Sequence, residues 1–149
     1  MASNDRSKSL DGKSLEFITL PDLPPLNLPQ DVVKTISLID VIWVKRDTRE
    51  IECAFEIEKS TSIYSGILRL IDLASSLGDK RYHFFLVAPD SREKEIIAQL
   101  QRPSFKNVEC VALRYMLFSD LYEHCKGLCK FGDDYSILLK IARGIECNC

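Results

Sequence analysis

Residues 39–61 read Ile-Asp-Val-Ile-Trp-Val-Lys-Arg-Asp-Thr-Arg-Glu-Ile-Glu-Cys-Ala-Phe-Glu-Ile-Glu-Lys-Ser-Thr. This stretch predicts a β-hairpin, because two runs rich in β-branched and aromatic residues flank a turn that is entirely polar. We expect the first strand at residues 38–45, the turn at 46–49 and the second strand at 50–59. The remaining elements are expected to assemble around this hairpin.

The acidic residues of the hairpin predict a metal site. Side chains alternate across a strand, so Glu56 and Glu58 share one face while Phe55 and Ile57 take the other. Asp40, on the partner strand, is placed to reach the face of the two glutamates. Converging carboxylates repel one another unless a cation offsets their charge, and hard oxygen ligands suit Mg²⁺ or Mn²⁺. The alternative is that the carboxylates are simply solvated on the open face of the hairpin.

The same residues resemble a known superfamily. Asp40, followed after 56 − 40 = 16 residues by Glu56-Ile57-Glu58-Lys59, is similar to the core of the PD-(D/E)xK nucleases, the restriction-endonuclease-like superfamily. Residues 55–66, 87–90 and 102–105 resemble one bacterial subgroup of it. The resemblance covers about residues 36–116. This chain departs from the common motif in having Ile39 in place of the proline and Glu58 in place of the lysine.

The resemblance implies a fold and a set of catalytic residues. The implied fold is α/β, a restriction-endonuclease-like mixed β-sheet flanked by helices. Asp40 and Glu56 would ligate Mg²⁺ (or Mn²⁺) with the backbone carbonyl of Ile57, and Glu58 would orient or deprotonate the attacking water. Lys59 would offset charge on the phosphate, or it is a surface lysine that alternation points to the other face.

A DNA contact is expected beside these acids. Ser62, Tyr64 and Arg69 lie on or near the start of the helix that follows the hairpin, and a helix N-terminus favours anions. We therefore expect these residues to contact a DNA phosphate. A buried pair of Arg69 with Asp72, or an interface role, is the competing interpretation.

The function predicted from these features is a Mg²⁺-dependent DNA endonuclease domain that hydrolyses phosphodiester bonds in restriction, repair or mobile-element defence. The resemblance implies a homodimer or a part of a larger nuclease. The alternative is a catalytically inactive descendant that binds DNA or a protein, since fold does not imply activity. A flavodoxin-like regulatory domain is a third possibility, but it would carry its acids at the carboxyl ends of parallel strands and not on a hairpin.

Length and composition set the outer bounds. A chain of 149 residues predicts one domain with a real core. The net charge of −2 is not the basic signature of many DNA-binding domains, although site acids can cancel basic patches. No apolar run approaches the ~20 residues of a membrane span, and the first residues show no hydrophobic signal region. We therefore expect a cytoplasmic protein whose six cysteines are reduced.

The N-terminal part predicts an arm and the rest a domain. Residues 1–30 are expected to form a flexible or extended arm, and residues 31–146 the nuclease domain. Residues 1–14 are polar and expected to be disordered, and residues 15–20 suit a short strand or an extended docking segment. Residues 21–29 contain four prolines, which exclude a helix or a central strand. Only residues 30–35 remain for a helix before the hairpin.

The remaining pattern alternates helices and strands. Helices are expected at residues 60–76, capped by Ser60 or Thr61, and at 90–101, opened by a capping box from Asp90 to Glu93. Strands are expected at residues 82–88 and 108–115. Two C-terminal helices, at 118–128 and 133–143, are expected to be separated at glycines. His83 is predicted to be a core or sheet-edge residue, and the cysteines near His124 have spacings that do not favour zinc.

Overall fold

The hairpin predicted from the sequence forms the start of the central sheet. The structure, a computed structural model, describes residues 8–10, 12–20, 29–45, 47–48, 50–77, 82–106, 113–131 and 134–144. Strand β3 (Val41–Val44) pairs antiparallel with β4 (Ile51–Ile57), with Val41 opposite Phe55. Both strands are shorter than predicted at the end that carries the acids, because the chain before β3 is still closing the preceding helix: the amide of Ile39 donates to the carbonyl of Ile36.

Two further strands complete a mixed sheet. Strands β5 (His83–Ala88) and β6 (Leu113–Leu117) extend it in the order β3-β4-β5-β6, and both added pairings are parallel. The expected arrangement, a hairpin first and parallel strands afterwards, is confirmed. The last strand runs further than predicted, to Leu117, and residues 108–112 of the predicted strand lie outside the described residues.

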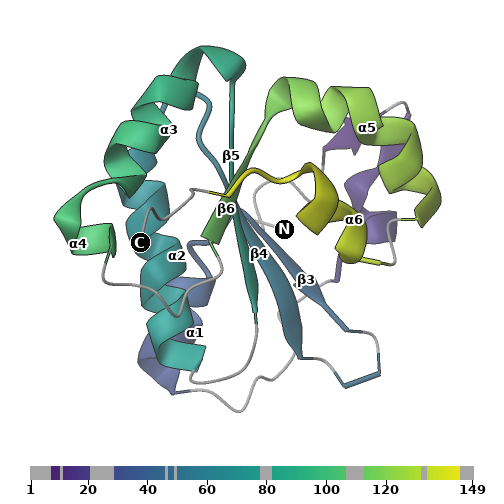
Figure 1. The fold of residues 1–149 in the computed structure, drawn as a ribbon. Coiled ribbons are helices and arrows are strands. Elements are labelled where there is room, and N and C mark those ends of the chain that lie inside the picture. The colour runs from purple at the N-terminus through teal and green to yellow at the C-terminus, as the bar shows by residue number, and fades with distance from the viewer. Residues whose placement is uncertain are drawn as a thin grey trace.

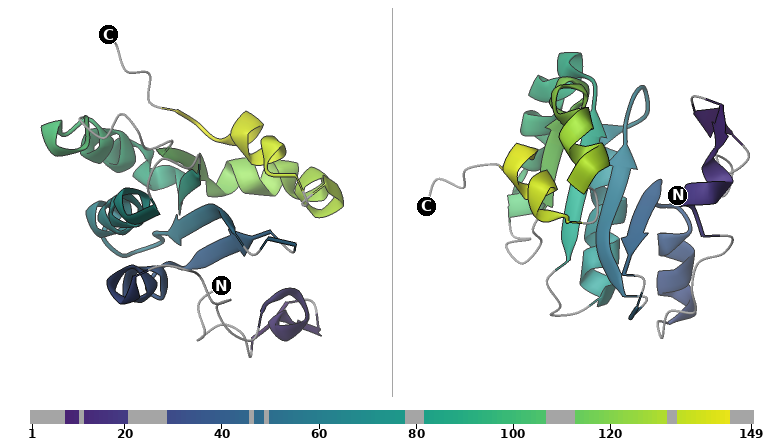
Figure 2. Two further views of the ribbon diagram at one scale, coloured as in Figure 1. Left: turned by 90° about the horizontal axis from the view of Figure 1, so that it is seen from below. Right: turned by 90° about the vertical axis from the view of Figure 1, so that its right-hand side faces the viewer.

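Helices cover both faces of the sheet, as Figures 1 and 2 show. Their bounds are α1 (Gln30–Ile36), α2 (Ile63–Leu77), α3 (Glu93–Leu100), α4 (Pro103–Lys106), α5 (Phe118–Phe131) and α6 (Ser136–Ile141), with 3-10 turns η2 (Leu15–Ile18) and η3 (Asp90–Arg92). Helices α1 to α4 contribute to the cores on one face, and α5 and α6 to the core on the other. The predicted α/β class, with helices flanking a mixed sheet and two of them C-terminal, is confirmed.

Alternation along β4 decides which side chains meet which layer. Ala54 packs toward α1 and α2, whereas Cys53 and Phe55 pack toward α5 and α6. Helix α1 belongs to the domain despite its seven residues, because Val32 and Ile36 are buried in the same core cluster as residues of α2. Glu56 and Glu58, two and four positions after Ala54, therefore point into the layer that contains α2.

The start of α3 is not capped as predicted. The helix is preceded by η3, its N-cap is Arg92, and no side chain makes a capping hydrogen bond there. The carboxylate of Asp90 instead accepts from the backbone amide of Ser119, at 3.2 Å, and from the hydroxyl of Ser119. The capping-box prediction is therefore wrong. The sheet brings the end of β5 next to the start of α5, and Asp90 accepts hydrogen bonds from Ser119 in that helix.

The C-terminal helices also differ from the prediction. Helix α5 continues through Gly127, so this glycine does not interrupt the helix. A Cβ at this position would meet only Ile137 Cδ1, at 3.9 Å. After α6 the chain returns to the sheet edge, where the backbones of Tyr115 and Arg143 exchange two hydrogen bonds. The guanidinium of Arg143 then bonds Glu93 and Asp120. These contacts tie the end of the described chain to β6, α3 and α5.

The N-terminal region contains more local structure than expected. Residues 9–14 include a short antiparallel ladder between β1 (Ser9–Leu10) and β2 (Lys13–Ser14), where disorder was expected, and Gly12 takes a φ of 75° at its turn. Residues 15–18 form the 3-10 turn η2, not a strand. Residues 21–28, the proline-rich part of the predicted arm, lie outside the described residues. The division into an arm and a domain stays a prediction.

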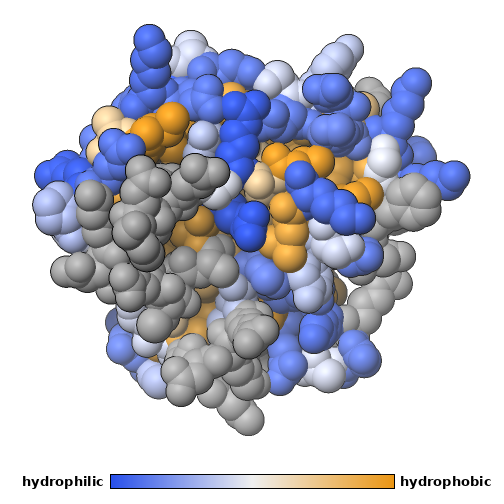
Figure 3. Space-filling model, viewed as in Figure 1, coloured by the Kyte–Doolittle hydropathy of each residue, from blue (hydrophilic) through white to orange (hydrophobic). Residues whose placement is uncertain are grey.

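The surface is mixed in character. Seen from the side of Figure 1, hydrophobic residues show as patches between hydrophilic ones, including a patch over the α5–α6 region (Figure 3). None of the helices described is long and apolar enough to cross a membrane.

Candidate active site

Strand β4 and Glu58, the residue directly after its end, bring two carboxylates into the interior. Glu56 and Glu58 are 0% and 1% exposed, and both lie on the face covered by α2, while Ile57 between them is 43% exposed. The predicted alternation is therefore seen in the structure. Burying an ionised carboxylate is unfavourable unless it is paired and hydrogen-bonded, so the contacts of these two groups decide what the site can do.

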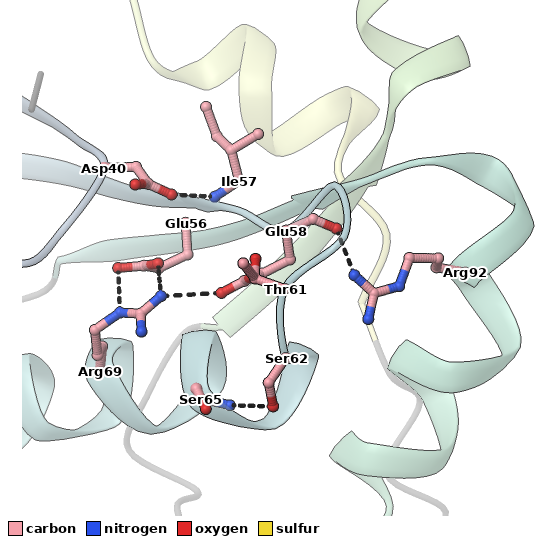
Figure 4. Close-up of polar contacts among 9 residues, drawn as sticks. All are labelled: Asp40, Glu56, Ile57, Glu58, Thr61, Ser62, Ser65, Arg69 and Arg92. Carbon is pink, nitrogen blue, oxygen red and sulfur yellow. Dashed lines mark hydrogen bonds and ion pairs between the residues drawn. The ribbon is translucent and has the colours of Figure 1, made fainter. Parts of the chain in front are cut away.

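Arg69 supplies the pairing. It comes from the second turn of α2 and reaches both glutamates (Figure 4). Its Nε donates to Glu56 Oε1 at 3.0 Å, and its Nη2 donates to Glu56 Oε2 and, at 2.9 Å, to Glu58 Oε1. A bidentate arginine–carboxylate pair is the strongest geometry available to these groups. The bond to Glu56 raises the pKa of Arg69, and the charges of both glutamates and Asp40 add to the effect.

Glu56 is the acid most affected by its surroundings. Burial raises its pKa, the hydrogen bond and the charge of Arg69 oppose that rise, and the negative charges of Asp40 and Glu58 add to it. The net direction is upward, so one guanidinium does not fully offset the burial and the neighbouring carboxylates.

Asp40 completes the acidic group from the neighbouring strand. Asp40 directly precedes β3, whose register with β4 ends with Val41 opposite Phe55, and its charge contributes to the raised pKa of Glu56. Its Oδ2 accepts from the amide of Ile57 at 2.8 Å, which holds the carboxylate at the end of β4. Asp40 faces an open hollow of about 500 Å³, called here the acidic hollow, which is lined by Asp40, Ile57, Glu58, Thr61, Ser62, Ser65 and Arg69.

Glu58 is held from several sides. The hydroxyl of Thr61 donates to Glu58 Oε2, so this carboxylate is bonded on both oxygens. Gly66 lies against it, and a Cβ there would come within 2.5 Å of Glu58 Oε1 and 3.0 Å of its Cγ. Arg92, from η3, donates to the backbone carbonyl of Glu58 at 2.8 Å. Helix α2 therefore approaches the strand closely because a glycine faces the acid.

The residues expected to bind DNA separate into two places. Ser62 and Arg69 line the acidic hollow, and the hydroxyl oxygen of Ser62 accepts from the amide of Ser65 at 3.3 Å. Ser62, and not Ser60 or Thr61, is thus the side chain that caps α2. Tyr64 does not line the hollow. Its ring packs against Phe105 with centroids 5.4 Å apart, and the guanidinium of Arg102 lies over it.

Lys59 is exposed and does not line the hollow. Its predicted role in catalysis, like that of the Ile57 carbonyl, stays a prediction. Sequence reasoning did not anticipate Thr61 or Arg92 as partners of Glu58. The hydroxyl follows the acid by three residues and was interpreted only as a cap, whereas Arg92 is 34 residues away, with no local signal to link it to Glu58.

The donor set fits a divalent cation in chemistry but is not preassembled around one. Asp40, Glu56 and Glu58 with Arg69 sum to −3 + 1 = −2, and carboxylate oxygens are the ligands that Mg²⁺ prefers. Within the described residues, however, no group of three or more His, Cys, Asp or Glu side chains is arranged to hold a metal. Figure 4 shows that the guanidinium of Arg69 bonds both glutamates and so occupies carboxylate oxygens that a metal would use.

His83, His124, Cys53 and Cys125, in the part of the chain that the structure describes, do not line the acidic hollow. His83 is half-buried in β5 and stacks on Tyr135 with ring centroids 4.6 Å apart, as expected for a core residue. Burial, followed by the charge of Arg114, lowers the pKa of His83. His124 and Cys125 are exposed on α5, and Cys147 and Cys149 lie outside the described residues.

Comparison with known proteins places the chain in a family. Residues 1–132 match the family model described as the type II restriction enzyme NmeDI C-terminal domain, so the chain belongs to that family and is a restriction-enzyme-related domain. The type II restriction enzyme NmeDI of Neisseria meningitidis serogroup C is 31% identical over 96 residues, which are 62% of this chain and 26% of that enzyme. The chain thus spans about a quarter of the length of this curated relative. No solved structure gives a significant match.

Proposed function

We propose that this domain is a metal-dependent deoxyribonuclease of the PD-(D/E)xK type that hydrolyses DNA phosphodiester bonds, most simply in restriction. The observation that carries the proposal is the acidic group itself: Glu56 in β4 and Glu58 just after it are buried, and Asp40 just before β3 lies beside an open hollow. Asp40, Glu56 and Glu58 have one guanidinium between them, so the group carries a formal charge of −3 + 1 = −2 that a divalent cation would offset. Membership of a restriction-enzyme family supports DNA as the substrate.

In this proposal the ion, Mg²⁺ or Mn²⁺, supplies charge to polarise the scissile phosphate and to lower the pKa of a bound water. Asp40 and Glu56 hold the ion, with the Ile57 carbonyl as a further ligand. Glu58, at the position where the common motif has lysine, accepts a proton from the attacking water, since a carboxylate cannot donate one when ionised. Ser62 at the start of α2 faces the hollow where a phosphate would lie, and the amides of the helix N-terminus favour that anion.

The other predicted residues keep smaller roles in the proposal. Lys59 and Tyr64 would contact the DNA backbone outside the hollow, since neither lines it. A second active site is needed to cut the second strand, and a homodimer or a larger nuclease that contains this domain would supply it.

A specific observation also favours the alternative of an inactive module that binds DNA or a protein. All four side-chain oxygens of Glu56 and Glu58 already accept hydrogen bonds from the protein. A domain that had lost its metal would be expected to satisfy its buried acids in this way. The two functions differ in one measurable property, which is cleavage that depends on a divalent ion.

The test is a cleavage assay on plasmid and branched DNA with Mg²⁺, with Mn²⁺ and with EDTA, comparing the wild-type protein with Asp40→Asn. Asp72→Asn is the matched control, because Asp72 is an exposed acid of α2 that does not line the hollow. We expect cleavage with either ion and none with EDTA, loss of cleavage in Asp40→Asn, and no change in Asp72→Asn. Cleavage by Asp40→Asn at the wild-type rate would overturn the assignment of Asp40 as a ligand, whereas no cleavage by any protein while DNA is still bound would favour the inactive module.

A further inference from the structure

Arg69 occupies the oxygens that a metal would need. Three of the four side-chain oxygens of Glu56 and Glu58 accept from its guanidinium, and the fourth accepts from Thr61. A cation bound to Glu56 would have to share or replace these contacts, because the guanidinium bonds both oxygens of that carboxylate. A divalent ion bound to Glu56 therefore competes with Arg69 for the same carboxylate oxygens.

The arginine also has room to leave. Its side chain is 31% exposed although both its partners are buried, and it forms part of the wall of the acidic hollow. A rotation about its flexible stem would carry the guanidinium from the glutamates into that open space without moving the backbone of α2. Arginine is suited to the new position as well, since its planar fork binds phosphate oxygens as readily as carboxylates.

We propose that Arg69 is a displaceable counter-ion: it pairs with Glu56 and Glu58 in the metal-free protein, and the divalent ion replaces it there and turns its guanidinium into the acidic hollow. This inference rests on the proposed metal-dependent function and adds a positioning residue to it. Before the ion binds, Arg69 holds the two acids together against their repulsion. Once displaced, it lies where a DNA phosphate would bind.

The first measurement is Mn²⁺ binding, by calorimetry and by the electron paramagnetic resonance of free Mn²⁺, to the wild-type protein and Arg69→Met. Because the competing charge-assisted hydrogen bonds are removed, Arg69→Met should bind Mn²⁺ roughly 10-fold tighter or more. Its melting temperature without metal should fall, and Mn²⁺ should raise that temperature by more than in the wild type. Arg92→Met is the matched control. It removes an equal charge near Glu58 but frees no carboxylate oxygen of the cluster, because Arg92 bonds a backbone carbonyl.

A second measurement follows Arg69 in the wild-type protein itself. In the wild-type protein the Nε–H of Arg69 donates to Glu56, so its nitrogen signal should be resolved by NMR, and Arg69→Lys assigns it. Saturating Mg²⁺ should shift or broaden this signal, while the Nε–H signal of Arg92, which donates to exposed Glu95, stays in place.

The outcomes are distinguishable. If Arg69→Met binds Mn²⁺ no tighter than the wild type, or if Mg²⁺ binds and leaves the Arg69 signal unchanged, Arg69 is not displaced and the inference is wrong while the metal-dependent function stands. If Arg92→Met gains as much Mn²⁺ affinity as Arg69→Met, the gain comes from the loss of any nearby positive charge, and this result would also overturn the inference. If neither the wild type nor Arg69→Met binds Mn²⁺, the proposed function fails, and the inference fails with it.

Discussion

Gly66→Ala tests how closely α2 approaches the buried acid. In an exposed helix interior this change stabilises the helix by about 1 kcal/mol. Here the added Cβ would lie 2.5 Å from Glu58 Oε1, 3.0 Å from Cγ and 3.1 Å from the carboxyl carbon. A methyl group cannot be accommodated at these distances unless the Glu58 side chain moves, so the sign of the effect should reverse.

The magnitude follows from the bonds that Glu58 would lose. Its carboxylate accepts from Arg69 and Thr61, and hydrogen bonds to charged groups contribute about 1.5–3 kcal/mol each. Losing both would destabilise the fold by about 3–6 kcal/mol, and the gain in helix propensity reduces this to about 2–5 kcal/mol. Because the acid leaves its position, cleavage should fall together with stability.

The assay is urea unfolding of the wild type, Gly66→Ala and Gly127→Ala. Gly127 is the matched control, because it lies inside α5 and its Cβ would make only an ordinary contact at 3.9 Å. This control should be stabilised by up to about 1 kcal/mol. The single variant Glu58→Ala and the double variant Gly66→Ala with Glu58→Ala complete a double-mutant cycle. In the Glu58→Ala background, the alanine at position 66 should lower the free energy of unfolding little or not at all. A Gly66→Ala protein that is more stable than the wild type and cleaves DNA as fast would refute the close packing of α2 on Glu58.

Three further predictions address other parts of the molecule. Glu58→Gln should lower the cleavage rate by roughly 10²-fold, the scale of general-base effects, and leave DNA binding intact, while Glu95→Gln, an exposed acid of α3, serves as its control. Burial, and after it the charge of Glu52, raises the pKa of Cys53 to about 12. Its thiol should therefore resist iodoacetamide in the native protein at pH 8.5. The free energy of unfolding should also fall as the pH rises from about 9 toward 12, because the thiol ionises more readily in the unfolded chain than in the folded one. Mass spectrometry of the labelled peptides checks the resistance to iodoacetamide, and modification as fast as that of exposed Cys125 would contradict it. Ile36→Ala, at a residue 1% exposed between α1 and the sheet, should cost about 2–4 kcal/mol in urea unfolding; an unchanged midpoint would mean that α1 is not part of the core.

The hairpin and its acids were predictable from the sequence because both depend on local periodicity. Alternation along a strand places Glu56 and Glu58 on one face wherever the strand lies, and a polar turn between two apolar runs predicts an antiparallel pair. The mixed sheet was predictable for a related reason. The apolar run that became β5 predicted a strand covered on both faces, which is usual in parallel arrangements.

The contacts of those acids required the tertiary structure. Whether Arg69 faces a phosphate, Asp72 or the glutamates depends on the rotation of α2 against β4, and no pattern within the helix encodes that angle. The same is true of Gly66: the sequence showed a glycine where helix propensity disfavours it, and only the packed structure identified Glu58 as its neighbour. Asp90 was misassigned because the capping pattern is local, whereas the amide that it binds belongs to Ser119, 29 residues further along the chain.

By itself, then, the sequence determined the elements, their faces and the presence of an acidic group on the hairpin, since these follow from backbone geometry repeated every two or 3.6 residues. The tertiary structure alone decided that the charge of this group is offset first by Arg69. Pairing between buried ionised groups depends on distances set by how the layers pack, and a carboxylate removed from water binds whichever donor the packing places beside it.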